Sequence, residues 1–96
     1  MTGISGLAFS TDGMLDRLRR WVECESPSYE PAAVERMLDL VSRDLTMLGA
    51  ACSRIPGDGR FAGCLKASWP HRLAGEPGIL VIVHFDTVHP LGTLER

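Results

Sequence analysis

Two stretches of the chain carry apolar residues at the spacing of an amphipathic helix. In the first stretch the opposite face is charged, and the apolar positions are Met14, Leu15, Leu18, Trp21 and Val22. This pattern predicts a helix that starts near Met14, with Thr11 or Asp12 as its cap. The helix should stop near Ser26-Pro27, because the residue before a proline is disfavoured in the α region. Residues 1–13 are then expected to form a flexible leader.

The second helical stretch follows a loop at residues 25–29. Pro31 suits the first position of a helix, where its missing N–H costs nothing, and Gly49 suits the left-handed residue that ends one. Between them runs an apolar stripe formed by Val34, Met37, Leu38, Val41, Leu45 and Leu48. We therefore expect a helix from Pro31 to about Leu48, with this stripe in the core.

After Gly49 the pattern becomes that of strands. Residues 50–55 and 61–68 are expected to form a hairpin, because the sequence between them, Pro-Gly-Asp-Gly-Arg, is typical of a turn. A polar loop at residues 69–78 leads to Ile79–Val83, five β-favouring apolar residues without alternation. Such a run is typical of a strand buried on both faces of an α/β sheet. The expected fold class is therefore α/β.

Composition narrows the classes of function. The 96 residues suffice for one domain, and 45% hydrophobic with 23% charged residues is ordinary for a globular protein. A net charge of −2 offers no basic surface for nucleic acid or an anionic membrane. The N-terminus has no basic region before its short apolar stretch, so it is a poor signal peptide and a cytoplasmic location is expected.

The three cysteines, Cys24, Cys52 and Cys64, are odd in number, widely spaced and never in a C-x-x-C pair. Such spacing supports neither a disulfide framework nor a zinc knuckle. We expect all three to be small buried hydrophobic residues in a reducing compartment.

The candidate chemistry lies directly after the apolar run, where open α/β sheets place their sites. In extended chain His84 and Asp86 face one way, while Phe85 points into the packing. A carboxylate beside an imidazole can accept its ring N–H, fix its tautomer and leave the other nitrogen free for a metal. A hydrogen-bonded His–Asp pair without any metal explains the same spacing.

Other arrangements of residues compete with this pair as the candidate chemistry. His84, Asp86 and His89 form H-x-D-x-x-H, which would supply three ligands on one loop, although a surface or substrate-side role suits His89 better. There is no G-x-S-x-G elbow, and Gly57-Asp-Gly59 lacks the lysine and hydroxyl residue of a P-loop. His71 is expected to be solvated, as is the basic face formed by Arg17, Arg19 and Arg20.

The run from His84 to Leu94, His-Phe-Asp-Thr-Val-His-Pro-Leu-Gly-Thr-Leu after an apolar strand, resembles the first metal-site motif of the M20 metallopeptidases. This family includes glutamate carboxypeptidases, acetylornithine deacetylase and succinyl-diaminopimelate desuccinylase. The order of two helices, a hairpin and the motif strand agrees with it, so the resemblance covers about residues 14–94. Residues 14–96 would then be the N-terminal, incomplete part of a three-layer α/β/α catalytic domain.

The resemblance implies roles for two residues. His84 matches a ligand of the family's two-zinc centre, and Asp86 matches the aspartate that orients this ligand. This sequence differs from the family pattern at Val83, where family members often have Gly or Ser. The implied activity is zinc-dependent hydrolysis of an amide bond next to a free carboxylate, in a small N-acyl amino acid or peptide. The resemblance also allows other divalent metals such as Co²⁺. It further allows a homodimer of the full-length protein.

A catalytic zinc ion is usually coordinated by about three protein ligands and a water molecule. His84 supplies one, His89 and Cys64 are weaker candidates, and helix carboxylates such as Glu35 and Asp39 are expected on solvated faces. The chain alone is therefore expected to be inactive. The competing hypothesis is a non-catalytic α/β fragment with no activity of its own.

Overall fold

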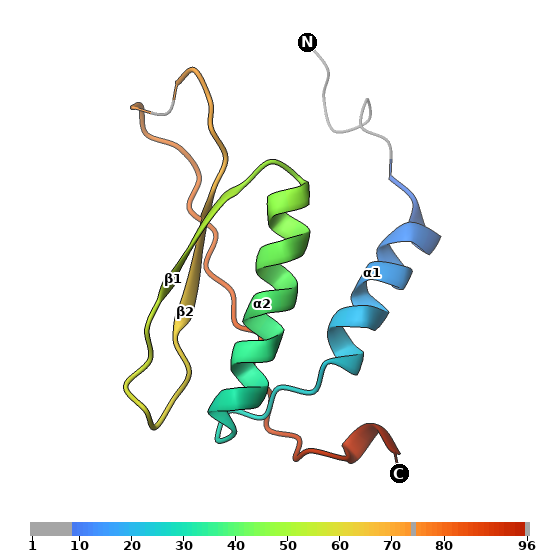
Figure 1. Cartoon of the computed structure of the whole chain (residues 1–96). Coiled ribbons are helices and arrows are strands. Elements are labelled where there is room, and N and C mark those ends of the chain that lie inside the picture. The colour runs from blue at the N-terminus through green and yellow to red at the C-terminus, as the bar shows by residue number, and fades with distance from the viewer. Residues whose placement is uncertain (1–8, 74, 96) are drawn as a thin grey trace.

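The computed structural model describes residues 9–73 and 75–95. Its elements are the helices α1 (Thr11–Glu23) and α2 (Pro31–Met47), the strands β1 (Ala51–Ile55) and β2 (Cys64–Ser68), and a short 3₁₀ helix, η2 (Thr93–Glu95). Figure 1 shows α2 between α1 and the β1–β2 hairpin. The fold is thus a small α/β arrangement of two helices and an antiparallel two-stranded sheet.

Helix α1 begins earlier than its apolar pattern predicts. The cap is Ser10, whose hydroxyl accepts a hydrogen bond from the Gly13 backbone N–H at 3.1 Å. Thr11 and Asp12, the expected caps, are therefore helical, and the predicted leader boundary at residue 13 is wrong for residues 11–13. Residues 1–8 of that leader lie outside the described residues.

Helix α2 begins at Pro31 and ends before Gly49, as the sequence predicts. Gly49 has a φ of 95°, which a side chain would strain, and this left-handed residue turns the chain towards β1. The stripe is buried from Val34 to Val41, partly buried at Leu45 and exposed at Leu48. The core consists of Ala33, Val34, Met37, Leu38, Val41 and Ala50.

The hairpin is antiparallel, with Ala51 opposite Ser68 and Ile55 opposite Cys64. Its second strand is shorter than the predicted 61–68, because the turn is longer. Asp58 accepts the backbone N–H groups of Arg60 and Phe61. A Cβ on Gly63 would clash with the Ile55 carbonyl oxygen, so only glycine fits where β2 begins.

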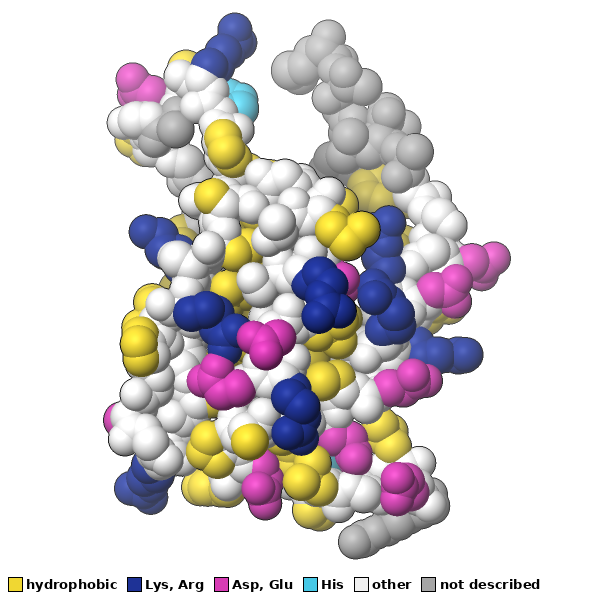
Figure 2. Space-filling model, viewed as in Figure 1, with side chains coloured by type: hydrophobic (Ala, Val, Ile, Leu, Met, Phe, Trp, Pro, Cys, Tyr) yellow, Lys and Arg dark blue, Asp and Glu magenta, His cyan; other side chains and the backbone are white. Residues whose placement is uncertain are grey.

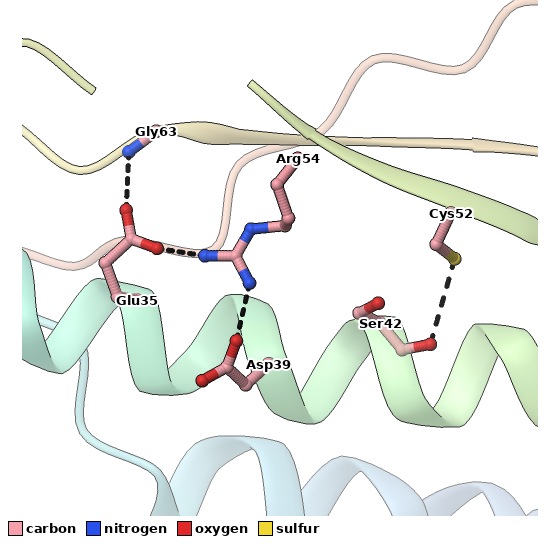
Figure 3. Close-up of polar contacts among 6 residues, drawn as sticks. All are labelled: Glu35, Asp39, Ser42, Cys52, Arg54 and Gly63. Carbon is pink, nitrogen blue, oxygen red and sulfur yellow. Dashed lines mark hydrogen bonds and ion pairs between the residues drawn. The ribbon is translucent and has the colours of Figure 1, made fainter. Parts of the chain in front are cut away.

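A cluster of charged groups holds the hairpin against α2 (Figure 3). The Arg54 guanidinium on β1 donates to the carboxylates of Glu35 and Asp39 on α2. The second Glu35 oxygen accepts the Gly63 backbone N–H at 2.9 Å. Glu35 and Asp39 are therefore not merely solvated, as expected from the sequence, because β1 brings a cation to them.

Helix α1 is held more lightly. Asp44 of α2 accepts hydrogen bonds from Arg20 at 2.9 Å and from the Trp21 indole N–H at 2.7 Å. No residue of α1 is buried, and its apolar residues other than Trp21 are about half exposed: Met14, Leu15, Leu18 and Val22. Arg20 thus has a partner on α2, whereas Arg17 and Arg19 are exposed as predicted.

Ile79–Val83 is not a buried strand, and this prediction is wrong. The five residues are between 64% and 95% exposed and belong to no sheet. In Figure 1 the segment runs as an irregular trace from the far end of the hairpin towards the lower end of α2. The physical reason is that burial on both faces needs flanking strands and helices, and the described residues provide none for this segment.

Candidate functional site

The loop after α1 holds the segment that carries the candidate motif. Pro27 and Thr87 form an isolated parallel bridge, in which Ser28 N–H donates to Thr87 C=O and Thr87 N–H donates to Ser26 C=O, each at 2.9 Å. The Ser26 hydroxyl, on a residue only 3% exposed, donates to Phe85 C=O at 2.7 Å. These bonds fix the backbone on both sides of Asp86.

The predicted pair, His84 and Asp86, lies in contact within this segment. His84 Nδ1 is 3.3 Å from Asp86 Oδ1 and 3.1 Å from the Asp86 carbonyl oxygen. Both partners are acceptors, so neutral His84 must carry its proton on Nδ1 to make these bonds. The lone pair is then on Nε2, and the His84 side chain is 85% exposed.

Asp86 has a second partner that sequence reasoning missed. Ser28 donates its hydroxyl hydrogen to Asp86 Oδ2 at 2.7 Å. This bond is the main reason why the pKa of Asp86 lies below its usual range, and the nearby His84 lowers the pKa further. No spacing rule links residues 58 positions apart, so only the fold reveals the contact.

Phe85 packs against α1, in line with the packing role that the sequence predicts for it. Its ring meets the Trp21 ring edge-on, with centroids 5.7 Å apart. Because Trp21 is hydrogen-bonded to Asp44, this aromatic contact ties the motif to both helices. Two contacts thus position the His84–Asp86 pair: the packing of Phe85 on Trp21 and the hydrogen bond from Ser28 to Asp86.

Glu25 holds the chain after the motif in the same way. Its carboxylate accepts the backbone N–H groups of Gly92 at 3.0 Å and Leu94 at 3.2 Å, where η2 begins. These two bonds lower the pKa of Glu25. The sequence hardly indicates this contact, because its only sign is a carboxylate in the loop after α1.

Two cavities flank the motif, and His84 lines both. One, of about 280 Å³, is mostly apolar and lies among Leu18, Trp21, Met37, Phe85 and Leu94. The other, of about 320 Å³, has apolar walls from α2 and β2 and a polar end formed by Ser28, His84 and Asp86. Each is near the lower size limit of small-molecule sites.

The remaining candidate ligands do not join the pair. Across residues 9–73 and 75–95, no three His, Cys, Asp or Glu side chains are grouped so that they could hold a metal ion. The H-x-D-x-x-H reading as three ligands on one loop is therefore wrong for this structure. The exposed His89 donates its backbone N–H to Thr87 Oγ1, and His71 is exposed as predicted.

The cysteines depart from the expected burial. All three are free, as predicted, but Cys24 and Cys52 are only partly buried and Cys64 is exposed. Cys64 lies at the start of β2, which has no strand on its outer edge in the described part of the chain. It lines the same cavity as His84.

On the face seen in Figure 2, acidic and basic side chains are interleaved over the two helices, without a large patch of one sign. Within the described residues, neither helix has the length and apolar character needed to cross a membrane.

Comparison with known proteins adds no relative. No protein-family model matches the chain, and no curated protein or solved structure matches it.

Proposed function

We propose that this chain carries the first metal-site motif of an M20-type metallopeptidase. The observation that supports this most is the His84–Asp86 pair, whose Nδ1 to Oδ1 distance is 3.3 Å. A histidine that ligates a metal almost always donates its other ring N–H to a carboxylate or a carbonyl group, and His84 has both within reach. In this proposal His84 binds zinc through Nε2.

Each residue around His84 then has a defined task. Asp86 holds the imidazole in the tautomer that leaves Nε2 unprotonated, and Ser28 orients the Asp86 carboxylate and lowers its pKa. Zinc, when bound, would polarise a carbonyl group and lower the pKa of its water. The described residues supply one ligand of such a zinc centre, His84. They do not form a complete centre, because no three His, Cys, Asp or Glu side chains are grouped among them. Hydrolysis therefore requires ligands and a general base from additional polypeptide.

The proposed substrate class is a small N-acyl amino acid or peptide with a free carboxylate beside the amide, and the proposed location is the cytoplasm. The cavity of about 320 Å³ beside Ser28, His84 and Asp86 has room for a small acyl group against its apolar wall. The second candidate function is a non-catalytic α/β fragment. The lack of a three-ligand group among residues 9–73 and 75–95 favours it.

A zinc titration followed by NMR tests the metal-ligand role. We expect the Nε2 resonance of His84 to shift on adding Zn²⁺ while Nδ1 stays protonated. Asp86→Asn should weaken zinc binding roughly 10–100-fold, which is the usual cost of losing such a partner. His71→Ala is the matched control, because His71 is exposed and lies outside the site. Equal binding by wild type and His84→Ala would contradict the proposal.

Activity and the gene separate the two candidate functions. With excess zinc and N-acyl-glutamate or N-acetylornithine, the 96-residue chain should release no free amine above background. If the frame continues after codon 96 with a Glu-Glu pair and a later histidine, the longer product should hydrolyse one of these substrates, and His84→Ala should nearly abolish the reaction. A stop codon at that point would favour the non-catalytic fragment.

A further inference from the structure

The most exposed apolar surface of the chain is the segment Gly78–His84. Ile79–Val83 are all large aliphatic residues, and their exposure of 64–95% is far above that of ordinary scattered surface residues. Between residues 77 and 84 no backbone N–H or C=O takes part in a backbone hydrogen bond within the described chain. The segment therefore offers both unpaired backbone groups and apolar side chains, the two features by which an open edge recruits another strand.

The ends of this free edge are marked by the structure. Pro77 has no N–H to donate and cannot extend a ladder. At the other end, the Phe85 carbonyl group and both backbone groups of Thr87 are already bonded to residues 26–28. The part left free for pairing is thus residues 78–84.

The sequence of this segment is nearly symmetric about Val81. Ile79 and Val83 are both β-branched, and Leu80 and Ile82 are isomers of equal size. Two antiparallel copies centred on Val81 would place Ile79 opposite Val83, Leu80 opposite Ile82, and Val81 opposite itself. Gly78, which has no side chain, would then face His84 of the second copy and leave its imidazole uncrowded.

We propose that a second copy of this chain pairs with residues 78–84 as an antiparallel strand, giving a two-fold symmetric dimer. Such a contact is self-complementary, closed and free of charged residues within its length. Parallel in-register pairing would also match like residues, but it leaves a new edge at each step and so does not close.

The available area indicates a weak dimer. Full burial of the five aliphatic side chains would remove on the order of 300–600 Å² of apolar surface per copy. A standard interface buries about 800 Å² per partner, so the contact falls in the class of weak, concentration-dependent interfaces. The dimer proposal concerns the 96-residue chain and does not rest on the metal-ligand role of His84. Polypeptide that completed the proposed catalytic domain would compete with the second copy for residues 78–84.

Sedimentation velocity over a roughly hundredfold range of protein concentration tests the dimer. We expect a reversible monomer–dimer equilibrium. Val81→Lys should raise the dissociation constant at least about tenfold, because it places two lysines opposite each other at the centre of the ladder. Val88→Lys is the matched control, since Val88 is 91% exposed but lies outside the segment, and it should leave the equilibrium unchanged. Helical circular dichroism should be the same in both variants.

Disulfide trapping tests the register, in a Cys64→Ser background that removes the exposed thiol. Val81→Cys should cross-link two copies at least about tenfold faster than Val83→Cys, because only position 81 lies opposite itself. Equal rates would indicate parallel in-register pairing and overturn the proposal. Open-ended aggregates, equal dissociation constants for Val81→Lys and Val88→Lys, or a monomer at every concentration would also overturn the proposal.

Discussion

Ser28 and Asp86 lie 58 positions apart in the sequence and share a hydrogen bond of 2.7 Å from the Ser28 hydroxyl to Asp86 Oδ2. The bond is the main cause of the lowered pKa of Asp86, the only carboxylate that contacts His84 among the described residues. The sequence around Ser28 predicts only a loop residue. Ser28 is therefore a positioning residue of the candidate site, and its removal has a measurable signature.

Ser28→Ala should raise the pKa of Asp86 towards its ordinary value, because the largest cause of its lowering is removed. An Asp with a lowered folded pKa stabilises the fold above its unfolded pKa of about 3.9, and this contribution is lost as the pH falls through the folded pKa. The variant should lose less stability on acidification than wild type. Carboxyl ¹³C titration by NMR measures the shift. Ser28→Thr keeps the hydroxyl and should keep the low pKa, whereas an unchanged pKa in Ser28→Ala would refute the assignment.

Arg54→Ala should loosen the hairpin from α2. Arg54 binds two carboxylates at once, Glu35 and Asp39, and Glu35 also holds the Gly63 N–H. Because these groups are partly exposed, solvent screens them, and we expect a loss of about 0.5–2 kcal/mol in the free energy of unfolding. Urea denaturation checks this. Arg43→Ala, an exposed arginine on α2, is the control and should change stability by less than about 0.5 kcal/mol.

Gly63→Ala should destabilise the chain far more than another Gly→Ala exchange. The new Cβ would meet the Ile55 carbonyl oxygen, which is part of the hairpin backbone and cannot move aside cheaply. A cost of about 2–4 kcal/mol, or failure to form the hairpin, is expected. Gly75→Ala is the matched exchange, since nothing lies within 4 Å of its Cβ position. Thermal unfolding of the two variants at equal midpoints would show that the turn is not as tight as described.

Glu25→Gln should release η2 from the loop after α1. The lowered pKa of Glu25 comes first from its bond to the Gly92 N–H and next from that to Leu94. The tether is thus complete above the unfolded pKa of about 4.3 and is lost as the pH falls through the lowered folded value. In wild type, the amide shifts of Gly92 and Leu94 should follow that titration. In Glu25→Gln they should be almost independent of pH, and a persisting titration would point to another group.

The elements predicted correctly are those that local chemistry determines. Pro31 and Gly49 mark the ends of α2 because each has a backbone preference that acts without the rest of the fold. The same holds for the turn at Asp58, whose carboxylate bonds its own neighbours. The contact between His84 and Asp86, two positions apart, is also local, and the structure contains it.

What the sequence could not supply depends on contacts between distant residues. Ile79–Val83 has the composition of a buried strand, but composition does not provide the neighbours that bury it. Glu35 and Asp39 look solvated until β1 brings Arg54 to them. The bonds of Ser28 and Glu25 to the later part of the chain span 58 to 69 positions, and no periodicity marks them.

The loop after α1 therefore has a kinetic consequence. All its bonds to residues 85–94 close chain loops of about 60 residues, whereas α2 and the hairpin are built from near neighbours. Closing a long chain loop lowers the conformational entropy before the stabilising contacts have formed. These bonds should therefore form last during folding and open first under native conditions. Amide exchange should then be faster at Ser28 and Thr87 than in the middle of α2. The orientation of His84 would be a late and reversible event, available to be stabilised by whatever binds there.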